Sequence, residues 1–359
     1  MKAWIHSPAV DGVFILGPSL AVTAALFAFP SLFSQQEGVP PWLWLLLIVG
    51  VDVTHVYTTL YRTYFDKVEL AAHPLRYRLA PLIGWAAGVL LYRVDPLLFW
   101  RVLAYLAVFH FMRQQYGFFM IYRRADPPAP SWQLRLDKAV IYAATLYPLL
   151  YWHTHLPRHF DWFVAGDFLA LPSWLEPPGK IIYLLLLATY AAKEIWRAKQ
   201  GVAFNLPRNL LLLGTAGSWY AGIVLFNGDL AFTAANILAH GIPYMALVWI
   251  HGRSAASHSR ETPRFIDRFF SQRLLPIYVG IPLALAWAEE ALWDGMIWRD
   301  HPTLFRWFHA LPKLADPAML AWLVPLLALP QITHYLLDGF LWRRRAPEKA
   351  SLAPVSAAA

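Results

Sequence analysis

The chain has 359 residues and contains no cysteine, and this absence excludes several kinds of site at once. Without thiols there is no disulfide, no iron–sulfur cluster and no cysteine-bound zinc. A metal ion bound by this chain would therefore need nitrogen or oxygen ligands from His, Asp, Glu, Asn, Gln or Tyr side chains.

Charged residues are also scarce. They make up 14% of the chain, whereas hydrophobic residues make up 58%, and the mean hydropathy is +0.42. A soluble domain carries about a quarter charged residues, so the composition and the long apolar runs indicate an integral membrane protein. The net charge of +8 does not predict nucleic-acid binding, because the basic residues are confined to loops between the apolar segments.

The apolar segments predict an all-α, polytopic membrane bundle of about ten transmembrane helices. Basic loops alternate with neutral or acidic ones, and the acidic loops include residues 161–176 and 289–316. By the positive-inside rule, this alternation predicts a multi-pass protein of the inner membrane with both termini in the cytoplasm. Only four residues join the third and fourth segments, so eight or nine full crossings also fit. The predicted spans are residues 12–30, 41–61, 79–94, 96–122, 138–152, 180–197, 207–226, 229–251, 274–293 and 318–342.

Residues 1–345 are expected to form one membrane domain. Residues 346–359 are mostly small and include proline, which predicts a disordered cytoplasmic tail.

Four of the predicted spans each contain a histidine with a polar side chain three or four residues away. Residues at this spacing share one face of a helix, so each span presents a histidine beside a carboxylate or an amide. Ionisable groups inside a bilayer are costly and usually face the interior of a bundle, where they serve function. The pairs are Asp52 with His55, His110 with Gln114, Asn236 with His240, and His334 with Asp338.

The four histidines are also expected at a similar depth in the membrane. In the predicted topology all four spans run from outside to inside, and the next cytoplasmic arginine follows each histidine by seven to thirteen residues. At 1.5 Å per residue, this places the imidazoles roughly 10–20 Å from the cytoplasmic face. Similar depth is what a single metal site requires, so His55, His110, His240 and His334 are the predicted metal ligands.

Further polar residues lie on the same helical faces. Asp52 and Asp338 are expected to be additional ligands or to hold a neighbouring histidine by its ring N–H, and with Tyr244 they are the candidate catalytic residues. Pro243 removes a backbone hydrogen bond beside His240 and is expected to open room there. A structural role, in which these polar groups satisfy one another between helices, is the alternative. The expected outer partners of the ligands are Gln114, Asn236, Gln331 and Thr59.

A second group of histidines lies in an outer loop. His153, His155 and His159 have a metal-like spacing, but Pro157 interrupts any helical face that they would share. No metal site is therefore expected there.

Imidazole and carboxylate ligands without thiolate favour iron, and zinc, copper or manganese less selectively. Such iron sites activate O₂, and a site within the membrane would select a lipophilic substrate such as an isoprenoid, a carotenoid or another lipid. The expected partners are thus membrane lipids, O₂ and a lipophilic small molecule. Two alternatives remain: a membrane carrier that translocates protons or metal ions, and a membrane protein with bis-histidine haem.

The order of these motifs resembles the bacterial Brp/Blh-type integral-membrane carotenoid dioxygenases. The resemblance is carried by His334-Tyr-Leu-Leu-Asp338, a late histidine followed by an aspartate one turn on, and by His55, His110 and His240 in the places of the earlier histidine motifs. It covers short stretches of about four spans. The chain lacks the Pro-His-Gly element of the first motif and has Thr59 where a carboxylate would follow His55. The resemblance implies a metal-dependent oxygenase that cleaves a carotenoid such as β-carotene.

Overall fold

The computed structural model describes residues 3–34, 38–258 and 264–341, and these residues form helices and loops with no strand. All ten segments that the sequence predicts as spans are helical. The predicted disordered tail, residues 346–359, lies outside the described residues.

Helices in the first half of the chain include four short π-helical or 3₁₀ pieces, labelled η. They are α1 (Pro8–Asp11), η1 (Gly12–Leu16), α2 (Gly17–Ala28), α3 (Pro30–Phe33), α4 (Pro41–Trp44), η2 (Leu45–Val53), α5 (Thr54–Thr58), η3 (Thr59–Arg62), α6 (Lys67–Ala72), α7 (Pro74–Val94), α8 (Pro96–Arg123), α9 (Ser131–Thr154) and η4 (Ser173–Leu175).

The second half contains the longest helix, α12. Its elements are α10 (Glu176–Lys199), α11 (Leu206–Trp219), η5 (Tyr220–Leu225), α12 (Asp229–His258), η6 (Phe265–Phe270), η7 (Gln272–Leu274), α13 (Leu275–Trp293), η8 (Asp294–Trp298), η9 (Phe308–Ala310), α14 (Pro317–Leu327) and α15 (Leu329–Leu341).

Within the part of the chain that the structure describes, four helical stretches are long and apolar enough to cross a membrane: Pro8–Ala28, Pro41–Arg62, Asp229–Ser257 and Gln272–Trp298. A fifth arises if the pair α14 and α15, bent by 43°, counts as one span. Ten spans are therefore not supported by length and composition. The predicted span 318–342 is not one helix, because the helix is interrupted between α14 and α15.

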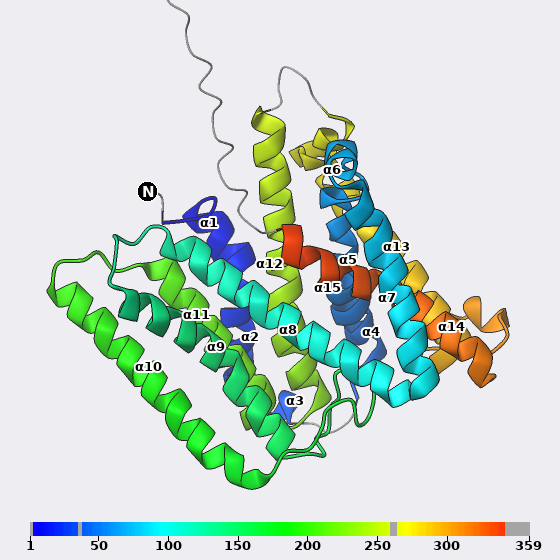
Figure 1. The fold of residues 1–359 in the computed structure, drawn as a ribbon, viewed down its shortest axis with the longest axis horizontal. Coiled ribbons are helices and arrows are strands. Elements are labelled where there is room, and N and C mark those ends of the chain that lie inside the picture. Colours follow the sequence, from blue (N-terminus) through cyan, green and yellow to red (C-terminus); the bar gives the residue numbers. More distant parts are fainter. Residues whose placement is uncertain (1–2, 35–37, 259–263, 342–359) are drawn as a thin grey trace, which may run out of the picture.

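Helix α12 forms the centre of the bundle. In Figure 1 it runs from the top to the bottom of the view, with α9, α10 and α11 on one side and α7, α13 and α14 on the other. It packs against α2, η2 and η5 through a core that includes Val22, Leu26, Val51 and Ala235. Helix α8 crosses the view diagonally and joins the two sides (Figure 1).

Two glutamates that the sequence counts toward an acidic loop lie in a helix instead, and an arginine is buried in another helix. Glu289 and Glu290 belong to α13, and the Glu289 side chain is buried. Arg208 lies in the first turn of α11, fully buried, where its guanidinium bonds to Asp126 and Glu194. A buried charge needs a partner, and these ion pairs allow the arginine to be buried. The charge of Arg208 therefore does not mark a loop.

Candidate metal centre

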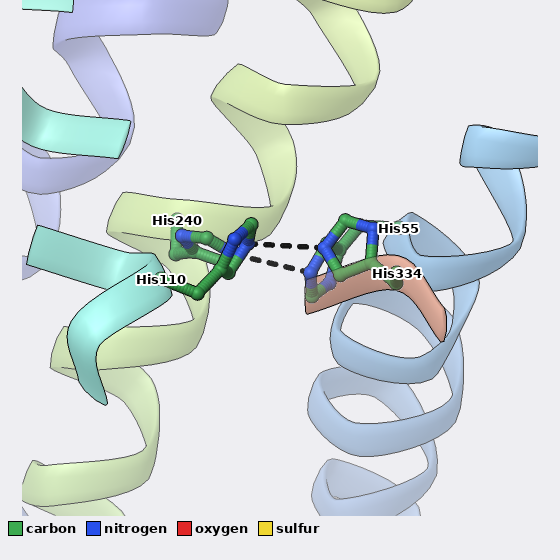
Figure 2. Close-up of side chains that lie close together, drawn as sticks. All are labelled: His55, His110, His240 and His334. Atoms are coloured by element: carbon green, nitrogen blue, oxygen red, sulfur yellow. Dashed lines mark hydrogen bonds between the residues drawn. The ribbon is translucent and has the colours of Figure 1, made fainter. Parts of the chain in front are cut away.

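The structure brings His55, His110, His240 and His334 together from four separate helices. Figure 2 shows the four imidazoles facing one another, carried by α5, α8, α12 and α15. The Nε2 atoms of His55 and His240 lie 3.1 Å apart, those of His240 and His110 3.2 Å, and those of His110 and His334 3.0 Å. All four rings are buried, with at most 4% of any residue exposed.

These nitrogen–nitrogen distances fit ligation of one metal ion. Metal–imidazole bonds are about 2.0–2.1 Å long, so nitrogens 3.0–3.2 Å apart subtend an angle of about 95–105° at a shared metal. One ligand atom from each histidine can be chosen so that all four lie within 4.8 Å of one another. Hydrogen bonding alone cannot explain the arrangement, because the single Nε2 of His110 faces two other Nε2 atoms.

The other ring nitrogens of two histidines have hydrogen-bonding partners that favour this orientation. Nδ1 of His334 lies 2.6 Å from the Thr59 hydroxyl, which lies 3.0 Å from the Tyr244 hydroxyl. The Tyr244 hydroxyl in turn donates to Asp338. A carboxylate oxygen of Asp338 lies 3.4 Å from Nδ1 of His110. With a proton on each Nδ1, the Nε2 lone pairs of His110 and His334 point at the centre.

Asp52 occupies an equivalent place behind His55, although the contact is looser. Its carboxylate oxygen lies 3.6 Å from Nδ1 of His55, too far for a hydrogen bond. The carboxylates of Asp52 and Asp338 therefore lie beside the Nδ1 atoms of two of the rings. Their two negative charges would balance a divalent cation held by four neutral imidazoles, which matters because an unbalanced buried charge is costly.

Asp338 contacts a histidine of another helix. The spacing of His334 and Asp338 predicts contact between them, but Asp338 faces His110 of α8, and Thr59 takes Nδ1 of His334. The sequence alone cannot show this exchange, because it depends on how α5, α8 and α15 dock.

Aromatic side chains form walls of the site. The Phe111 ring stacks on His240, with centroids 3.6 Å apart and planes at 8°. The Tyr335 ring lies 5.2 Å from that of His110, and the Tyr244 ring 5.0 Å from that of His334. These rings restrict water around the imidazoles and hold His240 in one orientation.

Gly241 allows two of the ligand helices to approach closely. A Cβ at this position would lie 2.8 Å from Cγ1 and 3.1 Å from the carbonyl oxygen of Val51, and 3.4 Å from Nδ1 of His55. The approach occurs where η2, a π-helical stretch, leads into α5 and His55. π-Helical segments are frequent at functional sites. A lone glycine beside a histidine in an apolar helix is the signal that could have identified this residue.

The three amide side chains that were expected beside the histidine rings form hydrogen bonds with other groups. Gln114 donates to the backbone carbonyl of His240, and Asn236 donates to the carbonyl of Phe232 in its own helix. Gln331 donates to the Glu289 carboxylate at 2.6 Å. The structure therefore brings Thr59 and Tyr244 to the histidine rings, whereas the three amides bond to backbone carbonyls or to Glu289.

The second group of histidines is separate from this cluster, and His153 lies in the last turn of α9 rather than in a loop. Nε2 of His153 lies 2.9 Å from the Tyr105 hydroxyl, and His155 is exposed and stacks on Tyr151. In the same loop Asp167 is buried and accepts hydrogen bonds from the backbone N–H groups of Phe163 and Val164. Burial raises the pKa of Asp167 to about 6, although these hydrogen bonds act in the opposite direction.

Comparisons with protein-family models, with curated proteins and with solved structures found no match to this chain. The resemblance to carotenoid dioxygenases remains a prediction from the short motifs. The function is therefore inferred from the geometry of the site.

Proposed function

We propose that this protein is an integral-membrane metalloenzyme, an iron-dependent oxygenase or dioxygenase that acts on a lipophilic substrate. One observation carries the proposal: four histidines meet in a buried site, where successive Nε2 atoms lie 3.0–3.2 Å apart and carboxylates lie behind two of the rings. Iron in such a site would supply oxygen activation. Zinc, copper and manganese are the alternative metals that the same donors accept.

The chain's own residues have distinct parts in this proposal. His55, His110, His240 and His334 would hold the metal. Asp338, 3.4 Å from Nδ1 of His110, would fix the tautomer of that ring and compensate charge. The hydroxyls of Thr59 and Tyr244, 3.0 Å apart, form a path along which a proton could move between Nδ1 of His334 and Asp338. Tyr244 is thus the residue proposed to donate or accept a proton at the metal centre.

An apolar cavity supports a lipophilic substrate. It has a volume of about 360 Å³ and is lined by residues that include Tyr92, Trp100, Trp298 and Val324. Trp100 and His110 both belong to α8, ten residues apart, so the cavity lies roughly 15 Å along this helix from the site. Isoprenoids, carotenoids and other lipids match such a lining. The resemblance to carotenoid dioxygenases favours the carotenoid class.

The same proposal includes a location in the inner membrane with cytoplasmic termini. Its support is the alternation of basic and acidic loops in the sequence. Several helices long and apolar enough to span a membrane are consistent with a multi-pass protein.

The decisive experiment is elemental analysis and an optical spectrum of the detergent-purified protein, followed by oxygen uptake with carotenoids, other isoprenoids and acyl lipids. Iron without a Soret band, together with substrate-dependent oxygen uptake, is expected. His110→Ala should lose most of the metal, whereas the matched control His155→Ala, exposed and outside the cluster, should retain it.

Other outcomes point to the alternatives. A Soret band would indicate haem. In a bis-histidine haem the two axial nitrogens lie about 4 Å apart on opposite faces of the porphyrin. Neighbouring histidine nitrogens of this cluster are only 3.0–3.2 Å apart, which leaves no room for a porphyrin between them. Protein that binds metal, never consumes oxygen and moves protons or metal ions in liposomes would be a carrier. Wild-type protein without metal would contradict both metal-dependent functions.

A further inference from the structure

Helix α12 has a broken hydrogen bond beside a proposed metal ligand. In a regular helix the carbonyl of Ala239 would accept a hydrogen bond from the N–H of residue 243, but that residue is Pro243 and has no N–H. Ala239 immediately precedes His240 and is buried. A buried carbonyl without a donor destabilises the fold, so a substitute donor is favourable here.

Gln115 of α8 supplies that donor. Its side-chain Nε2 donates to the carbonyl oxygen of Ala239 at 3.1 Å. The Thr215 hydroxyl of α11 shares its single proton between Oε1 of Gln115, 2.9 Å away, and the Leu211 carbonyl, 2.8 Å away. The contact with Oε1 fits an amide whose NH₂ group faces α12. Both side chains are buried, with 4% of Gln115 and 1% of Thr215 exposed. The next residue, Gln114, donates to the carbonyl of His240 at 2.9 Å.

Helix α8 therefore both carries His110 and holds the backbone of α12 at His240. The Nε2 atoms of these two histidines lie 3.2 Å apart. A shift of α12 along or away from α8 would change this distance directly, whereas metal ligation tolerates only about 0.2 Å.

We propose that Gln115 is a positioning residue, which replaces the hydrogen bond that Pro243 removes and so keeps His240 in register with His110. This inference rests on the proposed metal-binding function. It assigns Gln115 no contact with metal or substrate. Its action is through the backbone carbonyl of Ala239, and it depends on the proline four residues later.

That dependence gives a specific test. In Pro243→Ala, the new N–H can donate to the carbonyl of Ala239, so Gln115 becomes redundant. Metal-free full-length protein in detergent would be titrated with Co²⁺, whose optical bands report both affinity and ligand geometry. The variants are Gln115→Leu, Pro243→Ala and the double variant, with Gln133→Leu as a matched control because Gln133 is a buried glutamine of α9.

Gln115→Leu is expected to weaken Co²⁺ binding about 10–100-fold, the usual effect of losing an outer partner of a metal site. In the Pro243→Ala background the same substitution should change affinity less than about threefold. Gln133→Leu should bind Co²⁺ like wild type. Thr215→Val, which releases Oε1 of Gln115 without opening a cavity, should weaken binding in the same direction by a smaller factor.

The results test the metal centre and the role of Gln115 separately. Wild-type protein that binds no Co²⁺ would refute the metal centre itself. Wild-type binding with unchanged affinity in Gln115→Leu, or an equal loss in both backgrounds, would overturn the role of Gln115 and leave the metal centre intact. If Gln115→Leu is not recovered from membranes, recovery of the double variant with near wild-type affinity supports the inference, and loss of both overturns it.

Discussion

Replacing Gly241 by alanine tests how closely the helices of His55 and His240 must approach. The added Cβ would lie 2.8 Å from Cγ1 and 3.1 Å from the carbonyl oxygen of Val51. Non-bonded carbon atoms pack at about 3.5–4.0 Å, so relief of the first contact requires about 0.7–1.2 Å. The Val51 side chain can rotate, but its carbonyl belongs to the helix backbone and cannot move alone. α12 and the helix of His55 must therefore separate.

Separation of these helices would damage the metal centre. The Nε2 atoms of His55 and His240 lie 3.1 Å apart, and a displacement of several tenths of an ångström exceeds the tolerance of about 0.2 Å for metal–ligand bonds. We expect Gly241→Ala to lose most of its bound metal while the protein still inserts and folds. Alanine stabilises a helix interior by about 0.5–1 kcal/mol relative to glycine, so a general loss of helix stability is not expected.

Gly117→Ala is the matched control. Gly117 lies in α8, the helix of His110, and a Cβ there would meet nothing within 4 Å. Elemental analysis of both purified variants, with thermal unfolding in detergent, separates loss of metal from loss of fold. Full metal content in Gly241→Ala would refute the argument, and equal loss in both variants would show that any change of glycine in these helices disturbs the protein.

Three further predictions follow from other contacts. Asp338→Asn keeps the shape but removes the charge behind His110, so metal affinity and oxygen-dependent turnover should fall about 10–100-fold, and unchanged values would contradict the charge-balancing role. With its pKa raised to about 6, Asp167 binds more protons in the folded than in the unfolded state between about pH 4 and 6. Stability should therefore fall as pH rises through this window by up to about 3 kcal/mol, and Asp167→Asn should remove that part of the pH dependence; parallel wild-type and variant curves would disprove it. Reporter fusions after Arg124 should be cytoplasmic and fusions at Gly166 external, and the same side for both would show that the predicted topology is wrong.

The ligands could be selected from sequence because few alternatives explain a histidine in an apolar helix. His55, His110, His240 and His334 each lie in a long apolar stretch, where polar side chains are few. The energetic cost of burying such groups makes their presence informative. For the four histidines to meet at one site, they then had only to lie at a similar depth in the membrane.

The hydrogen bonds around the ligands could not be derived in this way. Thr59 meets His334 across 275 residues of sequence, and Asp338 meets His110 across the packing of α15 on α8. Helical spacing predicts neighbours within one helix. It contains no information on the rotation of one helix against another, which decides these partners.

The number of spans could not be predicted from the sequence pattern either. Helices α8 to α10 are long, but they carry charges such as Asp137 and Lys193 that pair inside the bundle. A loop-charge argument assumes that basic residues mark loops. When buried ion pairs join helices, the same residues lower the hydropathy of a helix without marking a boundary.

The positions of the carboxylates favour one metal ion rather than two. Dinuclear sites hold their ions about 3.5–4 Å apart and need ligands that reach both. Here the carboxylates of Asp52 and Asp338 lie on the Nδ1 side of His55 and His110, whereas the metal-facing atoms are the Nε2 nitrogens. Each imidazole offers one nitrogen to the centre, so no side chain is placed to bridge two ions. Elemental analysis should find one metal ion per chain, and a stoichiometry of two would require Asp52 or Asp338 to turn inward.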